Sequence, residues 1–596
     1  MIEAAAAAGA ECLSSHEGTW HAMTNDPLPN DPLPNDPPSH QQADPFDPAR
    51  LARWRQAHTA PLDWAPHEAA LLALLTDVQT AAQWSRHTLD RLARRRLGKD
   101  AAGQFTRDRL VQVYQALVAA GKMKDDRQTL ARLQRKPTRT ISGVAPVAVL
   151  TKPYACPGAC IFCPTDETMP KSYLRDEPGA QRAFLEHFDP FTQTAGRIAA
   201  LEAIGHAADK IELLILGGTW SAYPRRYQEE FVRRCLEAMN AQPAGSLAEA
   251  QAGNESATHR NVGLVIETRP DWITPEEVVW LRRLGVTKVQ LGVQSLDDRI
   301  LALNKRGHTV EQSRRAVRLL RAAGFKLHLH WMPNLLGATP ESDLADFARL
   351  WSDPALRPDE LKIYPCSLLE GAELMTHWRA GAYRPYTQDE LLELLIACKA
   401  LVPPDCRLNR VVRDIPSGYI VAGNRAVNLR QIVQQEMARR GLVCQCIRCQ
   451  EVRGHAVEAQ QLTLDALRHP TDISQEWFLR MVTPAGRLAG FLRLSLPRPF
   501  DAANPLTLAD VSAEIHGAAM IREVHVVGPA LVMGAESRGE AQHVGVGRRL
   551  VAAAQELAHA QGFRRLAVIA AVGTRDYYRR LGFELDDLYM HLRAAA

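Results

Sequence analysis

The sequence predicts an α/β protein in which a parallel sheet, curved into a full or partial barrel, is followed by a separate α+β domain. Two alternations of strand and helix patterns support this prediction. From Val144 to about residue 402, short apolar runs alternate with amphipathic helical stretches, which is typical of repeated strand and helix units in a parallel sheet. A second alternation begins near residue 460 and has apolar residues for a core of its own. A chain of 596 residues exceeds what one core usually supports, so several domains are expected.

The first 136 residues differ in composition from the rest of the chain. Residues 1–50 include an alanine run and the repeat NDPLPNDPLPNDPP, whose prolines and turn formers cannot build a packed core, so a disordered tail is expected. Residues 51–136 have helical apolar spacing and are basic. The whole chain has a net charge of only +4, yet the stretch from Arg86 to Arg139 holds fifteen Arg and Lys against five Asp. We expect a small helical region whose positive face is either a solvated surface or a site for a nucleic-acid backbone.

Six strands are expected between residues 137 and 402, alternating with helices. They are the runs VAPVAVLT, IELLILGG, VGLVIET, VTKVQLGV, KLHLHWM and LKIYP, separated by amphipathic stretches such as TPEEVVWLRRLG. In folds of this kind the loops that follow the strands carry the chemistry. The residues at the ends of these strands are therefore the first candidates for a functional site.

Three cysteines, Cys156, Cys160 and Cys163, follow the first of these strands at C-x3-C-x2-C spacing. The eleven cysteines of the chain include two tight clusters, which fit metal binding in a reducing cytoplasm better than a secreted disulfide framework. Three thiolates in one short loop can hold a 4Fe-4S cluster and leave one iron without a protein ligand. A zinc site or a chance arrangement is the alternative. No stretch is apolar enough for a membrane span, so a soluble cytoplasmic protein is expected.

This cysteine loop after the first strand of a barrel resembles the radical SAM superfamily, in which S-adenosylmethionine (SAM) binds the open iron and is cleaved to a 5'-deoxyadenosyl radical. The resemblance implies that polar strand ends hold SAM. The candidates are Gly217 and Gly218 in GGTW, Glu267 and Arg269 in IETRPD, Gln294 and Ser295 in GVQS, and Lys152 shortly before the cysteine loop. The alternative for each is a structural role, since a glycine pair after a strand often only forms a turn.

Residues 460–596 contain a Gln-x-x-Gly-x-Gly motif at the start of an expected helix. The backbone N–H groups and the dipole of such a helix form an anion site suited to the pyrophosphate of coenzyme A. Because the motif lies between the strands IREVHVVG and RLAVIAA, and YYRRLGF follows, this region resembles the GNAT acetyltransferase fold. The resemblance implies that acetyl-CoA contacts Gln542, Val544, Gly545, Val546, Gly547, Arg548, Tyr577 and Tyr578. The tyrosines are alternatively packing aromatics. Glu523 and Glu536 are unranked candidates for the base that an ordinary acetyltransferase needs.

A radical SAM barrel joined to a GNAT domain is a rare combination, and from about Lys136 onward the chain resembles the catalytic subunit of Elongator, in a single-chain prokaryotic form. The resemblance rests on stretches that include CPGACIFCP, ETRPDW, NKRGHTVEQS, HWMPNLLG, RDIPSGYIVAG and GTRDYYRRLGFELD. It implies modification of the wobble uridine of tRNA: the deoxyadenosyl radical takes a hydrogen from the methyl group of acetyl-CoA, and the carbon radical adds to carbon 5 of the uracil. Hydrolysis of the thioester would leave a carboxymethyl-type group, so no base for amine acetylation is required.

On this interpretation tRNA is the partner, and the basic stretch holds its sugar-phosphate backbone. The residues assigned to this contact are Arg91, Arg94, Arg95, Arg96, Lys99 and Lys122. Lys362 and Tyr364, at the end of the last expected barrel strand, are candidates for positioning the uracil or coenzyme A. Two other functions stay open: a protein lysine acetyltransferase with a structural cluster, and a non-catalytic tRNA-binding scaffold. An electron donor is required, and accessory subunits stay undetermined.

The expected linker at residues 403–459 carries a second cysteine group in the run CQCIRCQEVRGH. Cys444, Cys446 and Cys449 together with His455 make a complete tetrahedral set for zinc, with no open position. Such a site would lock an irregular linker between two domains. A second iron-sulfur cluster and metal-free cysteines are the alternatives.

Overall fold

The computed structural model describes residues 63–134, 140, 142–413, 415–453, 457–498, 512–528 and 545–593. The tail expected at residues 1–50 lies outside these ranges. Within them, no helix is long and apolar enough to cross a membrane.

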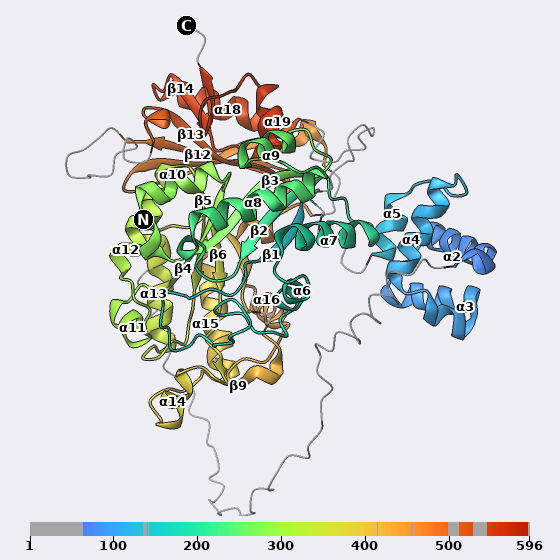
Figure 1. Ribbon diagram of the computed structural model, residues 1–596, viewed down its shortest axis with the longest axis horizontal. Helices are drawn as coiled ribbons and strands as arrows, with labels where there is room; N and C mark the ends of the chain where they lie inside the picture. The colour runs from blue at the N-terminus through green and yellow to red at the C-terminus, as the bar shows by residue number, and fades with distance from the viewer. Residues whose placement is uncertain are drawn as a thin grey trace, which may run out of the picture. The chain divides into compact units, whose positions relative to one another are not determined.

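Within residues 63–134, four α-helices form the basic region that the sequence predicts (Figure 1). They are α2 (Glu68–Thr80), α3 (Arg86–Gln104), α4 (Arg107–Ala119) and α5 (Arg127–Leu133). Ser85 begins α3 with a capping box shared with Thr88, and Gly98, at φ 76°, introduces a kink inside this helix. Gln134, at the end of α5, donates a hydrogen bond of 2.5 Å to the carbonyl of Gly205 and so joins these helices to the barrel.

Seven parallel strands in the described residues form the barrel sheet, in the spatial order β1-β2-β3-β4-β5-β6-β8. Their bounds are β1 (Ala145–Leu150), β2 (Lys210–Leu216), β3 (Arg260–Thr268), β4 (Lys288–Gln294), β5 (Lys326–Trp331), β6 (Glu360–Ile363) and β8 (Arg407–Arg410). Each strand pairs in parallel with its neighbours. Because β1 and β8 form the two edges of the sheet, the barrel is partial, as the sequence predicts.

Helices cover the outer face of this sheet (Figure 1). They are α6 (Pro178–Leu185), α7 (Pro190–Ala203), α8 (Arg225–Asn240), α9 (Leu247–Asn254), α10 (Pro275–Arg283), α11 (Asp298–Leu303), α12 (Val310–Ala322), α13 (Pro340–Ser352) and α15 (Gln388–Leu401). The short helix α14 (Leu374–Arg379) lies apart from this face. Four of these helices begin at a threonine whose hydroxyl caps the first turn, namely Thr274, Thr309, Thr339 and Thr387. Alternate side chains of each strand pack under the helices, and the others face the barrel axis.

The strand β8 lies inside the segment that sequence analysis assigns to the linker. It pairs with the edge of β6. Its four residues, RLNR, include a single apolar side chain, so they give no strand pattern of their own. Pairing with β6 overrides this weak local preference. The same part of the chain also contains β9 (Ile420–Ala422), which pairs with β7 (Leu368–Leu369) of the barrel segment in a two-stranded sheet, and then α16 (Leu429–Arg439) and α17 (Ile447–Gln450).

The C-terminal α+β domain contributes a hydrophobic core largely of its own. Its described strands lie in the order β10-β11-β12-β13-β14-β16-β15. Their bounds are β10 (Thr463–Pro470), β11 (Ser474–Val482), β12 (Leu488–Pro497), β13 (Ala519–Val526), β14 (Arg565–Val568), β15 (Glu584–Leu585) and β16 (Met590–Arg593), with helices α18 (Val546–Ala560) and α19 (Arg575–Arg579). The one parallel pair among these strands, β13 with β14, covers only Ala519–Ile521 of β13. The rest of β13 separates from β14 and leaves a cleft between them.

The C-terminal domain packs against the N-terminal ends of the barrel strands. Arg522 of β13 is buried and donates hydrogen bonds to Asp359 at 3.1 Å and to the carbonyl of Phe325 at 2.9 Å. Gly573 lies so close to β3 that an added Cβ would be 2.8 Å from the backbone of Asn261. These contacts join the two domains along one end of the barrel.

Candidate active site

The cysteine loop follows β1 and therefore lies at the C-terminal end of the barrel strands. The backbone N–H of Gly158 donates to the sulfur of Cys156 at 3.4 Å, and Arg306 donates to the sulfur of Cys160 at 3.5 Å. Burial and then the neighbouring Cys160 raise the pKa of Cys163 to about 12. A thiol with this pKa is protonated at neutral pH, so the loop needs a bound cationic centre before all three sulfurs can act as thiolates.

The glycine pair at the end of β2 is required by packing. Gly217 has φ 135°, and a Cβ added there would be 1.9 Å from the hydroxyl oxygen of Thr151. Gly218 also has positive φ, at 93°. A larger residue at Gly217 would displace Thr151, which directly follows β1, and both positions have the positive φ that favours glycine. The turn brings bare backbone beside the cysteine loop, where Thr219 approaches the sulfur of Cys156 to 3.7 Å.

Buried polar atoms without a hydrogen-bond partner gather at the ends of β3 and β4. Among the described residues they include Nη1 of Arg269, Oε1 of Gln294 and both ring nitrogens of His308. Asp271 holds the rest of the Arg269 guanidinium at 3.0 and 2.9 Å, and Nη1 reaches toward Gly158 in the cysteine loop. Buried polar atoms are normally paired. These unpaired atoms beside the three thiols therefore suit a polar ligand that binds together with a metal centre.

A second polar group lies on the barrel axis just below. The carboxylate of Glu267 is 3.7 Å from Nδ1 of His330, whose Nε2 is 3.0 Å from Oε1 of Gln290. Lys362 donates to the same oxygen of Gln290, and its ammonium lies 5.8 Å from the ring centre of Tyr364. Burial lowers the pKa of Lys362 to about 8, against the opposing effect of Glu267. Lys362 is thus placed to change its charge close to neutral pH.

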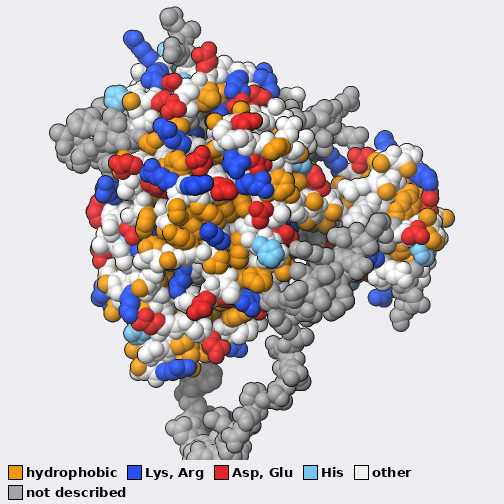
Figure 2. Space-filling model, viewed as in Figure 1, with side chains coloured by type: hydrophobic (Ala, Val, Ile, Leu, Met, Phe, Trp, Pro, Cys, Tyr) orange, Lys and Arg blue, Asp and Glu red, His pale blue; other side chains and the backbone are white. Residues whose placement is uncertain are grey.

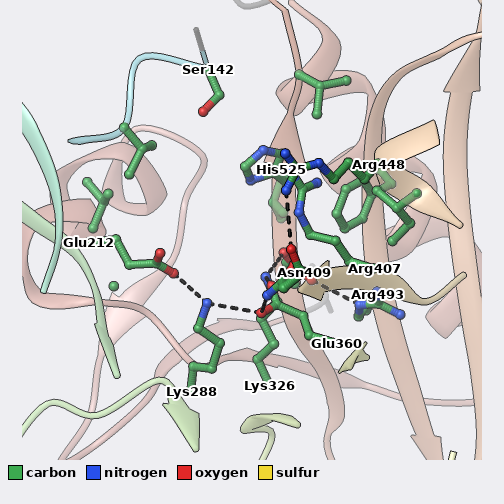
Figure 3. Close-up of a pocket in the computed structure, with 18 of the residues that line it drawn as sticks. Ser142, Glu212, Lys288, Lys326, Glu360, Arg407, Asn409, Arg448, Arg493 and His525 are labelled. Atoms are coloured by element: carbon green, nitrogen blue, oxygen red, sulfur yellow. Dashed lines mark hydrogen bonds and ion pairs between the residues drawn. The ribbon is translucent and has the colours of Figure 1, made fainter. Parts of the chain in front are cut away.

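The opposite, N-terminal end of the barrel opens on a cavity of about 860 Å³ (Figure 3). On its barrel side, Lys288 contacts Glu212 at 2.6 Å and Glu360 at 3.3 Å, and Lys326 contacts Glu360 at 2.6 Å. Barrels of this type are usually filled by branched apolar side chains. Here charged and polar side chains continue along the axis from this cavity to the group around Lys362, so the barrel has a polar interior.

The C-terminal domain contributes the other side of the cavity. The unpaired end of β13 and the end of β14 line it, together with Tyr578. Gly545, at φ 74°, is the N-cap of α18, a left-handed conformation that favours glycine. A Cβ added at Gly547 would lie 2.8 Å from the hydroxyl of Tyr577, so only glycine lets this tyrosine pack over the helix start. Of the predicted coenzyme A residues that are described, only Tyr578 lines this cavity, which faces the N-terminal mouth of the barrel, and Tyr577 packs against the start of α18.

Comparisons with known proteins identify the family. Residues 151–349 match the radical SAM superfamily, and residues 358–439 match the radical SAM C-terminal domain. The chain is 43% identical over 461 residues to the tRNA uridine(34) acetyltransferase of Dehalococcoides mccartyi. The alignment covers 76% of this chain and 99% of that protein. It is 34% identical over 505 residues to Elongator complex protein 3 of Danio rerio, in an alignment that covers 82% of this chain and 90% of that protein. The chain belongs to the Elongator complex protein 3 family.

A solved structure of this family has the same fold. Elp3 of the archaeon Methanocaldococcus infernus, with its residues 1–46 deleted, aligns with a TM-score of 0.66 and 36% sequence identity. The alignment covers 76% of this chain and the whole of that chain. The family and the fold class predicted from the sequence are thereby confirmed.

In this member of the Elongator complex protein 3 family, one of the two candidate bases, Glu523, lies in the described residues. Glu523 is buried between Lys326 and Arg493, with 2.9 Å between its carboxylate and Nε of Arg493. Burial opposes ionisation of Glu523, but these two cations outweigh it and lower the pKa of the carboxyl. A carboxylate held in this way is a weak proton acceptor at neutral pH. Glu536 lies outside the described residues.

The second cysteine group is compact. The sulfur atoms of Cys444, Cys446 and Cys449 all lie within 4.8 Å of one another. Hydrogen bonds from the other two thiols lower the pKa of Cys446, and backbone N–H groups add to this effect. Four ligands around one ion, at metal–sulfur distances of about 2.3 Å, place the sulfurs roughly 3.8 Å apart, so the group fits a single ion. His455, the predicted fourth ligand, lies outside the described residues.

The predicted RNA-binding residues fall into two kinds. Arg91 and Arg94 are exposed on α3. Arg95 and Arg96 instead contact Asp77 of α2, at 2.6 and 2.7 Å. Lys122 pairs with Glu68, and the side chain of Lys99 is outside the described set. On the face seen in Figure 2, positive and negative side chains are intermixed.

Some predicted ligand-binding residues lie apart from the unpaired buried atoms beside the cysteine loop, or in the core or on the surface of the C-terminal domain. The hydroxyl of Ser295 donates to Asp346 of α13 at 3.2 Å, which is a structural contact outside the barrel axis. Lys152 is exposed and lies over the ring of Tyr227 at 5.0 Å. Val546 is buried in the domain core and Arg548 is exposed, whereas Gln542 and Val544 lie outside the described residues.

Sequence reasoning missed several residues of the site. Arg306 and His308 contribute from the run NKRGH, which was used only to identify the family. Gln290 and His330 lie on the expected strands VTKVQLGV and KLHLHWM. Polar side chains at every second position of an otherwise apolar buried strand were the available signal, because such residues face the barrel axis together.

Proposed function

We propose that this chain is an enzyme that adds a carboxymethyl-type group, derived from acetyl-CoA, to carbon 5 of the wobble uridine of tRNA. The relatives named tRNA uridine(34) acetyltransferase support a tRNA uridine substrate. The observation that carries the proposal is the pairing of two sites on one barrel. A three-cysteine loop lies at the C-terminal mouth, and a cleft between β13 and β14 of the C-terminal domain faces the N-terminal mouth.

The residues at the C-terminal mouth fit a 4Fe-4S cluster with SAM. Three free thiols supply three ligands and leave the fourth iron for SAM. When bound, the cluster would supply the electron that cleaves SAM to a radical. Arg269, Gln294 and His308 offer the unpaired buried atoms that SAM needs as hydrogen-bond partners. The open backbone at Gly217 and Gly218 leaves room for it to approach.

The cleft of the C-terminal domain fits acetyl-CoA. The N-terminus of α18 would bind the pyrophosphate, because N–H groups and the helix dipole attract phosphate. Tyr577 and Tyr578 would lie along the pantetheine arm and place the acetyl group in the cavity beside Lys288. A barrel strand of seven residues spans about 23 Å. The buried polar side chains on the axis, such as Gln290 and His330, would have to move aside for the acetyl group and the uracil to meet.

Lys362 and Tyr364 would hold the uracil at the C-terminal mouth. An ammonium and a phenol can both donate to a carbonyl oxygen of the base. Near neutral pH most Lys362 side chains are charged, since the pKa is about 8. Arg91 and Arg94 would bind the tRNA backbone, and the three-cysteine group of the linker would bind one zinc ion with His455.

Glu523 is poorly suited to supply the base that the main rival function, acetylation of a protein lysine, requires. That reaction needs a base to deprotonate the amine. Glu523 is already paired with Lys326 and Arg493, which lower its proton affinity. A reaction on a carbon atom of uracil does not require this base.

The proposal is tested by nucleoside analysis. Anaerobically purified protein is incubated with SAM, acetyl-CoA, a reductant and bulk tRNA, and the digested tRNA is examined by mass spectrometry. We expect a uridine heavier by one carboxymethyl group, at the wobble position, only when all components are present. Acetylated protein lysines without SAM cleavage would favour the rival function and contradict the proposal.

A further inference from the structure

A segment after the cysteine loop crosses the open side of the partial barrel. The strands β1 and β8 stand at opposite edges of the described sheet and do not pair with each other. Residues 169–177, which we call the bridging segment, follow β1 and the cysteine loop, whereas Arg413 follows β8. Arg413 donates hydrogen bonds to the carbonyl of Ser172 and to the carboxylate of Glu177, the second at 2.6 Å. Side chains therefore join the two edges of the sheet at the C-terminal mouth.

The bridging segment is anchored by packing and by hydrogen bonds. Leu174 is buried in an apolar cluster that includes Leu369 of β7. The hydroxyl of Tyr419 donates to the carboxylate of Asp176 at 2.8 Å. Ser172 has φ 76°, a conformation that residues other than glycine adopt mainly where the surrounding structure holds it. The segment is therefore held at several points along its length.

Tyr173 makes the contact between the bridging segment and the barrel axis. Its ring centre lies 5.3 Å from the guanidinium carbon of Arg413, the distance of a cation–π contact. Its hydroxyl donates to the carboxylate of Glu267, at the end of β3, over 3.2 Å. Burial, and then the charge of Glu267, raise the pKa of Tyr173 well above its ordinary value. The phenol therefore keeps its proton at neutral pH and stays a hydrogen-bond donor.

Glu267 can accept a further hydrogen bond from a ligand. One of its oxygens accepts from Tyr173, and the other lies 3.7 Å from Nδ1 of His330. Two carboxylate oxygens offer about four acceptor positions, so these contacts leave some of them free. The side chain of Glu267 is 21% exposed, so a ligand at the C-terminal mouth can reach it. A carboxylate that is already held in place loses less conformational entropy when the ligand binds.

The ligand nearest to Glu267 is the one that binds beside the cysteine loop. Glu267 and Arg269 are two residues apart in extended backbone and so point to the same side. The unpaired Nη1 of Arg269 reaches toward Gly158 in the cysteine loop. In the proposed function this ligand is SAM, whose ribose hydroxyls and ammonium are hydrogen-bond donors. A carboxylate acceptor suits these groups.

We propose that Tyr173 is a positioning residue that holds Glu267 to accept a hydrogen bond from SAM, and that Arg413 keeps Tyr173 in place. The inference rests on the SAM site of the proposed function and adds two residues to it. The ribose hydroxyls and the ammonium of SAM are unchanged when the sulfonium is cleaved. Loss of the Tyr173 hydroxyl therefore weakens the binding of SAM and leaves the rate of the chemical step unchanged.

The test compares four full-length proteins, purified without oxygen: wild type, Tyr173→Phe, Arg413→Met and Tyr419→Phe. The Kd of SAM is measured by equilibrium dialysis without reductant, so that no cleavage occurs, and iron content is measured for each protein. We expect the Kd to rise about 10-fold in Tyr173→Phe, which loses one hydrogen bond to a charged group, and to rise also in Arg413→Met. Tyr419→Phe removes an anchor of the same segment that does not reach the barrel axis, so its Kd should equal that of wild type. Iron should be equal in all four.

Two kinetic measurements separate positioning from a structural role. With reductant, acetyl-CoA and tRNA present, deoxyadenosine formation by Tyr173→Phe should show the same rise in KM for SAM and an unchanged kcat. In a double-mutant cycle, Tyr173→Phe should add nothing to the effect of Glu267→Ala, because the hydroxyl then has no carboxylate to hold.

The inference and the proposed function fail in different ways. A wild-type Kd in Tyr173→Phe, an equal rise in Tyr419→Phe, or additive effects in the cycle would overturn the role of Tyr173 and leave the proposed function standing. A wild-type Kd in Arg413→Met would overturn the role of Arg413. Absence of deoxyadenosine from the wild-type reaction would overturn the proposed function, and the inference with it.

Discussion

Replacing Arg522 by Met should weaken the junction between the barrel and the C-terminal domain. The Arg522 side chain is 1% exposed. It joins Asp359, at 3.1 Å, to Glu476, at 2.8 Å, and also donates to the carbonyl of Phe325. Methionine has a similar length but offers no donor. Two buried carboxylates would then lose their shared cation.

The size of the effect follows from the partners that remain. Removing one member of a buried ion pair typically costs about 3–5 kcal/mol. Asp359 would keep Arg493 at 3.3 Å, and Glu476 would keep the hydroxyl of Ser474 at 2.6 Å. We therefore expect a loss near the lower limit, about 3 kcal/mol.

The stability difference between wild type and Arg522→Met should depend on pH in one direction. Burial opposes ionisation of Asp359, but Arg522 and Arg493 outweigh it and hold the pKa of this carboxyl well below its usual range. A carboxyl with a lowered pKa stabilises the fold above its unfolded pKa of about 4, and this stability is lost as pH falls through the folded pKa. The difference between wild type and Arg522→Met should be complete at pH 7 and shrink below about pH 4.

Urea unfolding followed by tryptophan fluorescence measures this difference. The matched control is Arg579→Met, which breaks an interdomain pair with Glu255 whose arginine is 42% exposed. Exposed pairs contribute about 0–1 kcal/mol, so this control should be nearly neutral. Equal stability of Arg522→Met and wild type at pH 7, or an equal loss in Arg579→Met, would refute the reasoning.

Three further outcomes are expected. Gly573→Ala should lower stability by about 1–3 kcal/mol in thermal unfolding, because the facing backbone of β3 cannot move away; an unchanged melting temperature contradicts the close contact. Product formation by wild type should fall as pH rises through about 8, because Lys362 loses its charge there. Lys362→Met should be less active and should not show this fall. The same fall in the variant would mean that another group causes it. Joint replacement of Arg91 and Arg94 by Ala should weaken tRNA binding and reduce by about 2 the slope of log affinity against log salt concentration. Arg96→Ala should change binding less, because Arg96 is already paired with Asp77. Equal effects of the two changes would show that the RNA site lies elsewhere.

The sequence predicts those parts of the fold that have a strong local pattern. The six apolar runs of the barrel and the helix after Gly545 form as expected, because apolar periodicity and turn residues agree there. The strand β8 was missed because RLNR is stabilised by pairing with β6 and not by its own residues. The cysteine loop was recognisable because all its ligands lie within one short run of sequence.

The rest of the site depends on distant segments. Gln290, His330 and Lys362 come from three strands and meet only on the barrel axis. The ion pairing of Glu523 with Lys326 joins two domains. Contacts of this kind follow from the tertiary arrangement, and no single-sequence pattern encodes them.

The central claim is that hydrogen moves from the methyl group of acetyl-CoA to a radical made from SAM. Anaerobic protein is incubated with tRNA, SAM and acetyl-CoA whose methyl group is fully deuterated, and both deoxyadenosine and the modified nucleoside are analysed by mass spectrometry. Cys160→Ser serves as the control without an intact cluster site. The account predicts that deoxyadenosine gains deuterium, that the new group on uridine retains the remaining deuterium, and that Cys160→Ser forms neither product. Modified uridine accompanied by deuterium-free deoxyadenosine would contradict it.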